Sequence, residues 1–194
     1  MPFTVQDTAL RDVKLLNITR FDDARGWFIE AHKHSDFTAA GIEAQFVQDN
    51  CSRSSRGVLR GLHFQLPPHE QGKLILPLEG RLYDVALDLR TGSPSYNRWQ
   101  AFTLDAATPQ ALWIPPGFAH GFLVLSETAL FLYKVTAEYA PGHEGGIRWD
   151  DPDLGIEWPQ RQPVLSPKDT ALPLLKDFCS PFVYGSAAGK EKGV

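Results

Sequence analysis

The sequence predicts an all-β protein. Across residues 46–136, short runs rich in valine, leucine, isoleucine and aromatic side chains alternate with turn residues, a pattern typical of sandwiches and barrels. No segment of ten or more residues in this block has helical periodicity. The 16 glycines and 15 prolines among 194 residues are a modest excess over average usage, which indicates many turns and short elements.

Seven strands are expected in this block. They are separated by turn sequences such as Glu79-Gly80 and Pro115-Pro116-Gly117, because proline cannot donate a hydrogen bond inside a central ladder. We expect the strands at residues 58–65, 73–78, 81–89, 99–104, 110–114, 121–125 and 128–136. Short helices are expected outside the block, at residues 35–41 and after Pro167.

The length of the chain predicts the number of domains, and its net charge excludes some classes of binding partner. A chain of 194 residues fits one domain, which we expect over residues 1–185, and the mostly small and charged residues 186–194 are expected to form a disordered tail. With 19 lysines and arginines against 23 aspartates and glutamates, the net charge is −4. This charge excludes the broad basic surface that binds nucleic acid or anionic membranes, so an anionic ligand requires a local basic pocket.

The cysteines and the apolar segments of the sequence indicate in which cellular compartment the protein is found. Cys51 and Cys179 form no CxxC motif, so neither a disulfide framework nor a thiolate zinc site is expected. Charged residues interrupt the first 20 residues, unlike the apolar core of a signal peptide, and the apolar stretch 121–135 is broken by Ser126 and Glu127. We therefore expect a cytoplasmic protein that does not span a membrane.

Polar side chains crowd one of the predicted strands and the start of the next. They are Arg60, His63, Gln65 and Lys73. Guanidinium and ammonium groups donate charge-assisted hydrogen bonds, and imidazole acts as a base near neutral pH, so the set suits one anionic, carbonyl-bearing ligand. The alternative for each residue taken singly is a solvated charge at the rim of a sheet.

Three further segments carry candidate groups. The turn at residues 116–117 is expected to direct His120 from the end of the sheet, and a hydrogen-bonded structural histidine is the alternative. Strand alternation places Tyr133 and Lys134 on opposite faces, where the alternative for the tyrosine is a place in the core. Asp169, in Ser166-Pro-Lys-Asp169, either orients an imidazole or belongs to an ordinary helix start.

Taken in order along the chain, these motifs resemble those of the dTDP-4-dehydrorhamnose 3,5-epimerase family. The resemblance runs from about Asp22 to Asp169. It is carried by Arg60-Gly-Leu-His-Phe-Gln65, Gln71-Gly-Lys73, Asp84-Val-Ala-Leu-Asp88, Ile114-Pro-Pro-Gly-Phe-Ala-His-Gly-Phe122, Tyr133-Lys134, Trp149-Asp-Asp-Pro152 and Ile156-Glu-Trp-Pro159. Separate motifs in one order are far more specific than any one of them.

The resemblance implies a cupin-type jelly roll, or double-stranded β-helix, with a few short peripheral helices. It also implies a homodimer that uses no metal or organic cofactor. The implied reaction inverts C3 and C5 of dTDP-4-dehydro-6-deoxy-D-glucose, giving dTDP-4-dehydro-L-rhamnose for dTDP-rhamnose biosynthesis. Both carbons flank the ketone, so the protein must supply a base, an acid on the opposite face and donors to the enolate oxygen.

The resemblance assigns catalytic roles to residues on three of these segments. His63 matches the base, and Asp169 matches the carboxylate that fixes the tautomer of that base. Tyr133 matches the acid. A phenol with a pKa near 10 suits this role, because it keeps its proton at neutral pH and still yields it to a carbanion. Lys73 matches the cation that stabilises the enolate.

The resemblance also implies a set of substrate-binding residues. They are Arg25, Glu30, Gln48, Asp49, Asn50, Arg60, His120, Tyr139, Glu144 and Lys168. Arg25 and Glu30 match groups that reach the site of the partner subunit, and the alternative is a surface ion pair of little energetic weight. Tyr139 matches an aromatic that stacks on thymine, and the alternative is a simple loop aromatic.

Strand geometry conflicts with one part of this site. In a regular strand Arg60 and His63 point to opposite faces, because their separation is odd. If both contact one ligand, Gly61 must mark a bulge or a strong twist. The sequence therefore predicts an irregularity at Gly61.

Three other functions stay open. The cupin fold also hosts metal enzymes, in which His63, Glu70 and His120 would be the ligands, but Gln65 stands where such sites usually have a second histidine. A sugar-nucleotide-binding protein without catalysis has no use for both a base and an acid. An enzyme that inverts only C3 or only C5 is the nearest alternative, because the motifs are shared within the family.

Overall fold

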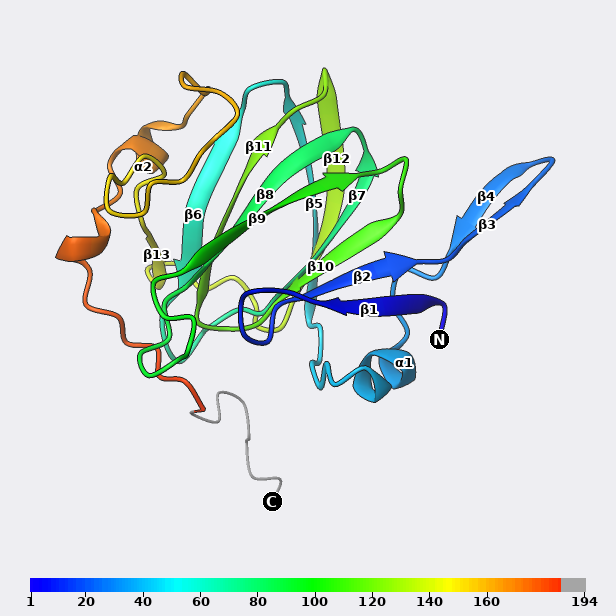
Figure 1. Ribbon diagram of the computed structural model, residues 1–194, viewed down its shortest axis with the longest axis horizontal. Helices are drawn as coiled ribbons and strands as arrows, with labels where there is room; N and C mark the ends of the chain where they lie inside the picture. Colours follow the sequence, from blue (N-terminus) through cyan, green and yellow to red (C-terminus); the bar gives the residue numbers. More distant parts are fainter. Residues whose placement is uncertain (186–194) are drawn as a thin grey trace.

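The computed structural model describes residues 1–185 and shows two antiparallel sheets that face each other (Figure 1). Sheet A contains, in order, β1 (Phe3–Asp7), β2 (Lys14–Ile18), β10 (Gln110–Ile114), β7 (Lys73–Glu79), β12 (Thr128–Val135) and β5 (Gln48–Ser55). Sheet B contains β13 (Glu144–Gly146), β6 (Leu59–Gln65), β11 (Phe118–Val124), β8 (Arg81–Asp88) and β9 (Trp99–Asp105). The peripheral elements are β3 (Arg20–Asp23), β4 (Gly26–Ile29), α1 (His34–Ala39), α2 (Pro167–Thr170) and the 3-10 helix η1 (Leu175–Asp177).

Apolar side chains from the inner faces hold the two sheets together. One buried cluster combines Ile75, Leu112 and Phe131 of sheet A with Leu82 and Phe122 of sheet B. Strands that are distant in the sequence are neighbours within each sheet, such as β5 with β12 and β6 with β11. This arrangement is a jelly roll, and it confirms the predicted fold class.

The expected strands are all present, and their bounds differ from the prediction by a few residues at most. The largest shift is in β11, which begins at Phe118 rather than at residue 121. Its first residue directly follows Gly117, whose φ of 87° makes the turn. The prediction that His120 extends from this turn at the sheet end is therefore wrong, because His120 lies within β11 between β6 and β8.

β5 is a strand that the sequence does not predict, because all its residues except Cys51 are polar. It consists of Gln-Asp-Asn-Cys-Ser-Arg-Ser-Ser and yet pairs with β12 along its whole length. Its alternate residues are partly or fully buried, whereas the residues between them are exposed. The buried set is Gln48, Asn50, Ser52 and Ser54. Polar residues can occupy this inner face because it borders a cavity rather than the apolar core.

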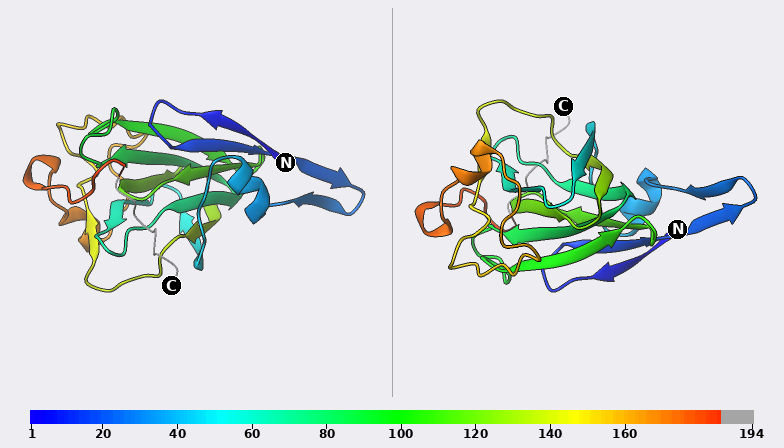
Figure 2. Two further views of the ribbon diagram at one scale, coloured as in Figure 1. Left: turned by 90° about the horizontal axis from the view of Figure 1, so that it is seen from below. Right: turned by 90° about the horizontal axis from the view of Figure 1, so that it is seen from above.

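A hairpin and two short helices surround the sandwich. The β3–β4 hairpin projects from the molecule in two opposite views (Figure 2), and more than half of Phe21, Trp27 and Phe28 is exposed. An exposed apolar projection of this kind indicates an interaction surface. Near its base, Phe37 of α1 is buried against sheet A. On the far side, Ser166 caps α2, so both helices expected from the sequence are confirmed.

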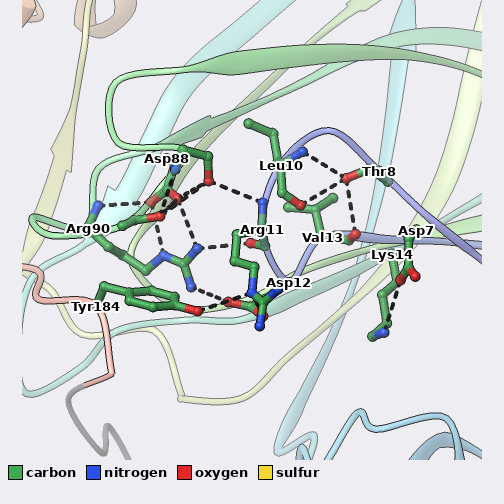
Figure 3. Close-up of polar contacts among 12 residues, drawn as sticks. Asp7, Thr8, Leu10, Arg11, Asp12, Val13, Lys14, Asp88, Arg90 and Tyr184 are labelled. Atoms are coloured by element: carbon green, nitrogen blue, oxygen red, sulfur yellow. Dashed lines mark hydrogen bonds and ion pairs between the residues drawn. The ribbon is translucent and has the colours of Figure 1, made fainter.

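A network of ion pairs and hydrogen bonds around the buried Asp88 and Arg90 joins three parts of the chain (Figure 3). Arg90 donates to both carboxylate oxygens of Asp88 at 2.9 Å and to Asp12 Oδ2 at 3.0 Å. Its guanidinium lies 5.0 Å from the ring centre of Tyr184, whose hydroxyl accepts from Arg11 Nε at 3.1 Å. Burial opposes ionisation of Asp88, but the hydrogen bonds it accepts lower its pKa. The network fixes the β1–β2 turn, the end of β8 and the segment before residue 185 together.

Two further expectations concern membranes and the end of the chain. Within residues 1–185, the helices are too short or too polar to cross a bilayer. The disordered tail expected at residues 186–194 lies outside the residues that the structure describes.

Candidate active site

Side chains from both sheets line a cavity of about 130 Å³ between them. Sheet B contributes Arg60, His63, His120 and Phe122. Sheet A contributes Ser52, Lys73, Phe131 and Tyr133. The predicted catalytic residues His63, Lys73 and Tyr133 therefore meet in one cavity, and the imidazole and the phenol are attached to opposite sheets.

β6 is irregular at Gly61, which confirms the expectation from the odd spacing. Its register with β11 pairs His63 with His120 but Arg60 with Phe122, so β6 holds one extra residue between them. Gly61 has a φ of 124°, in the region that favours glycine, and a Cβ there would collide with the Gly121 backbone. The bulge brings both Arg60 and His63 to the cavity.

His63 contacts a carboxylate that several other groups hold in place. Its Nε2 lies 2.7 Å from Asp169 Oδ1. The angle at Nε2 departs from that of an aligned hydrogen bond, so the contact is an ion pair when the imidazole is protonated. Asp169 also accepts the Gly61 N–H at 3.2 Å and the Ser166 hydroxyl at 2.6 Å. Burial raises the pKa of this carboxyl. The contacts with His63, Ser166 and Gly61 outweigh burial and lower the pKa well below its usual range. Asp169 therefore stays charged beside Nε2, which leaves Nδ1 as the ring nitrogen for a substrate.

Asp84 is a site residue that the sequence analysis does not assign. It is fully buried in β8, and both carboxylate oxygens lie 3.0 Å from His120 Nε2. Desolvation lowers the pKa of Lys73 to about 8, and the Asp84 carboxylate opposes this shift. Asp84 thus orients His120 and favours the charged form of Lys73. The sequence does carry one sign of this role: Asp84 stands among apolar residues in a predicted strand. A charge that is buried in such a strand requires a partner.

Tyr133 lines the cavity from β12, and strand alternation predicts that it shares its face with Phe131 and Val135. Phe131 and Val135 on the same face are buried, and Lys134 points to the other side of the sheet, where it pairs with Asp49. Burial raises the pKa of the Tyr133 phenol, and the Arg60 guanidinium partly opposes this effect. Because its pKa lies above the ordinary value near 10, the phenol keeps its proton at neutral pH and serves as a donor.

A second polar group, the rim cluster, extends to β13 and α2 from the face of β5 that carries Ser52 of the cavity. It consists of Gln48, Asn50, Tyr139, Glu144 and Lys168, all of them predicted binding residues. Glu144 Oε2 lies 2.7 Å from Lys168 Nζ, and hydrogen bonds from Lys168 and Tyr139 lower the Glu144 pKa. The Tyr139 N–H donates to Gln48 Oε1 at 2.9 Å, and Gln48 Nε2 donates to Asn50 Oδ1 at 2.8 Å.

Three predicted binding residues lie away from this cavity. Both carboxylate oxygens of Asp49 accept from Lys134 Nζ at 2.6 Å on the outer face of sheet A. Because side chains alternate along β5, Asp49 lies on the opposite face from Gln48 and Asn50. The structure therefore does not place all three residues together, contrary to the expectation from the sequence. Arg25 lies in the projecting hairpin, where its side chain is 90% exposed and pairs with Asp23. Glu30 follows directly after β4.

The metal-binding alternative has no matching geometry. Within residues 1–185, no three His, Cys, Asp or Glu side chains are grouped as metal ligands. His63 and His120 are cross-strand neighbours, but each contacts its own aspartate. Glu70 lines a separate cavity together with Arg90. The predicted set of two histidines and Glu70 is therefore not assembled.

The cavity combines the groups that carbon-acid chemistry requires. A base paired with a carboxylate faces it from sheet B, and a protonated phenol faces it from sheet A. A lysine and a second histidine line the same cavity and can donate hydrogen bonds to a developing oxyanion. Such a site can remove a proton next to a carbonyl group and return one to the opposite face of the carbon.

Comparisons with known proteins point to one family. The sequence profile of dTDP-4-dehydrorhamnose 3,5-epimerase matches residues 7–177. The dTDP-4-dehydrorhamnose 3,5-epimerase of Pseudomonas aeruginosa is 52% identical over 163 residues, which cover 83% of this chain and 90% of that protein. The Salmonella typhimurium enzyme of the same name is 49% identical over 170 residues, covering 87% and 93%.

Solved structures agree with the sequence comparisons. The crystal structure of dTDP-6-deoxy-D-glucose-3,5-epimerase from Legionella pneumophila, in complex with dTDP-4-keto-L-rhamnose, superposes with a TM-score of 0.86 at 44% identity. The superposition covers 90% of this chain and 93% of that one. Sequence, fold and cavity lead to the same result: the chain belongs to the dTDP-4-dehydrorhamnose 3,5-epimerase family.

Proposed function

We propose that this protein inverts C3 and C5 of dTDP-4-dehydro-6-deoxy-D-glucose, giving dTDP-4-dehydro-L-rhamnose for dTDP-rhamnose biosynthesis. One observation carries the proposal: His63 and Tyr133 face the same cavity from opposite sheets. Inversion requires that one proton leave a carbon from one face and another arrive at the opposite face. A sugar ring held between the sheets meets both groups at once.

The proposed reaction proceeds through an enolate. His63 Nδ1 takes the proton from a carbon next to the ketone, and the electron pair moves to the ketone oxygen. Asp169 stabilises the imidazolium that forms, while Lys73 and His120 donate hydrogen bonds to the enolate oxygen. Tyr133 then protonates the opposite face of the carbon, the ketone is restored, and solvent returns both groups to their starting protonation states. The same steps at the second carbon complete the double inversion.

We assign the nucleotide of the substrate to groups around the cavity. Arg60 suits the diphosphate, because guanidinium forms charge-assisted hydrogen bonds with phosphate oxygens. The rim cluster suits the nucleoside, and 53% of Tyr139 is exposed and available to stack on the base. Asp49 contributes indirectly, through the ion pair with Lys134 that fixes β5 from its outer face.

We further propose a cytoplasmic homodimer in which Arg25 and Glu30 reach the cavity of the partner subunit. The hairpin that carries Arg25 projects from its own sandwich and exposes three aromatic side chains, Phe21, Trp27 and Phe28. Contact with a second copy would bury these rings. Cys51 and Cys179 are free and exposed, which suits a reducing compartment.

Replacing Trp27 by glutamate is expected to convert a dimer into a monomer, because an unpaired charge in an apolar interface is costly. Analytical ultracentrifugation measures this change. Arg25→Gln is the matched variant in the same hairpin: it is expected to sediment as a dimer and yet bind dTDP about tenfold more weakly, since one charge-assisted contact is lost. A wild-type protein that sediments as a fully active monomer would contradict the proposal.

Product made in D2O and examined by NMR tests the proposed reaction. Deuterium is expected at both C3 and C5, with both centres inverted. Deuterium at one carbon alone would identify a mono-epimerase, and no deuterium would leave only binding of the sugar nucleotide. Heat-inactivated protein is the control for spontaneous exchange. Turnover is expected to survive treatment with EDTA, because the proposed steps use no metal or organic cofactor.

A further inference from the structure

Gln65, the last residue of β6, is 5% exposed, and its side-chain amide is bound entirely to backbone groups. Nε2 donates to the His69 carbonyl at 2.8 Å and to the Glu138 carbonyl at 3.2 Å. Oε1 accepts from the Ala140 N–H at 2.9 Å. His69 belongs to the loop 66–72, whereas Glu138 and Ala140 belong to the loop 136–143. One buried side chain therefore joins the loop before β7 to the loop after β12.

The bonds to the second loop lie on either side of Tyr139. The Glu138 carbonyl belongs to the peptide group before Tyr139, and the Ala140 N–H belongs to the peptide group after it. Gln48 Oε1 accepts the N–H of Tyr139 itself at 2.9 Å. The main chain of Tyr139 is thus held from both directions by two glutamine side chains, while its own side chain is 53% exposed.

We propose that Gln65 is a positioning residue that sets the orientation of Tyr139 for the nucleoside of the substrate. The inference rests on the proposed function, in which Tyr139 stacks on the base. An aromatic side chain on an unrestrained loop loses conformational freedom when a ligand binds, whereas one that is fixed beforehand avoids much of that loss. Gln65 also follows His63 by two residues on the same strand, so β6 connects the catalytic base to the nucleoside-binding loop.

The two loops have other contacts that keep them together without Gln65. The Leu66 N–H donates to the His143 carbonyl at 2.7 Å, and Gln71 Nε2 donates to the Ala137 carbonyl at 2.8 Å. Neither contact involves the peptide groups next to Tyr139. Loss of the Gln65 amide is therefore expected to alter the orientation of Tyr139 more than the attachment of the loops.

Gln65→Met tests this inference, since it removes the three bonds and keeps the length and neutrality of the side chain. Calorimetric titration is expected to show about tenfold weaker binding of dTDP, the equivalent of one side chain that must be ordered on binding. Binding of inorganic pyrophosphate, which has no base, is expected to change less than about twofold. KM for the sugar nucleotide should rise about tenfold, with kcat nearly unchanged.

Gln71→Met is the matched control. It removes a glutamine-to-carbonyl bond between the same two loops, two residues away from Tyr139. Its affinity for dTDP is expected to equal that of the wild type, even where its melting temperature falls. Equal losses of dTDP affinity in Gln65→Met and Gln71→Met would indicate a general loosening of the loops and would overturn the inference. If Gln65→Met fails to fold, Gln65→Asn, which keeps the amide but shortens its reach, takes its place.

Tyr139→Ala separates this inference from the proposed function. The variant is expected to bind dTDP weakly, and adding Gln65→Met is expected to weaken binding no further, because both changes remove the same interaction. If Tyr139→Ala binds dTDP as tightly as the wild type, the nucleoside assignment itself is wrong and the inference fails with it. If Tyr139→Ala weakens binding but Gln65→Met has no effect, or has its full effect in the double variant, only the inference fails.

Discussion

Replacing His63 with alanine is expected to abolish deuterium exchange at both C3 and C5. The imidazole is the base on the sheet B side of the cavity, and Asp169 stabilises the cation it becomes. A general base contributes up to about 10⁴-fold to a rate, so exchange at both carbons should fall by about that factor. NMR of the keto sugar incubated with the variant in D2O measures both carbons in one experiment.

A matched histidine variant controls for general effects of the substitution. His34, the first residue of α1, is exposed and lies outside the cavity, so His34→Ala is expected to retain wild-type exchange. Wild-type exchange at either carbon in His63→Ala would show that a different group removes that proton. Unchanged binding of dTDP by His63→Ala would confirm that the loss belongs to the chemical step.

Replacing Tyr133 with phenylalanine is expected to separate proton removal from inversion. The ring still fills its place beside Phe131, but the proton donor on the sheet A side is gone. His63 can still remove a proton, exchange it with D2O and return a deuteron to the same face, so the sugar should become labelled while keeping its original configuration. Inversion is expected to fall by roughly 10²- to 10³-fold, and exchange by less than about tenfold.

The configuration and the label are read from the same NMR spectra. Tyr96 is partly exposed and lies outside the cavity, so Tyr96→Phe is the matched control and is expected to behave as the wild type. Full inversion by Tyr133→Phe would show that another acid serves the opposite face. Complete loss of exchange in that variant would show that the phenol is needed before the proton is removed.

The sequence alone was sufficient where a prediction depended only on the two-residue period of a strand. The two-residue period of β12 places Tyr133 on the same face as Phe131, and the burial of Phe131 in the structure shows that this is the inner face. The odd spacing of Arg60 and His63 likewise predicts the irregularity at Gly61. In both cases the strand period is a local property, so it can be read without knowledge of the partner strands.

The parts that were missed depend on partners that are distant in the sequence. β5 has no apolar alternation because its inner face borders the cavity, and only its pairing with β12 identifies it as a strand. Asp84 acquires its role from His120, which comes from the neighbouring strand β11. Asp49 stands between two inward-facing residues, and only the register of β5 shows that it faces outward toward Lys134.

The spacing of the two sheets has a consequence for the choice of sugar. Stacked sheets lie about 10 Å apart, and that distance is set by the whole core rather than by a loop that moves. His63 and Tyr133 line this space from its two walls, so a pyranose ring bound between them, as proposed, has one face toward each wall. Bulky axial substituents would collide with one of the two sheets, whereas equatorial substituents extend parallel to the sheets. In the proposed binding mode, the spacing of the two sheets limits how far substituents can project above and below the sugar ring.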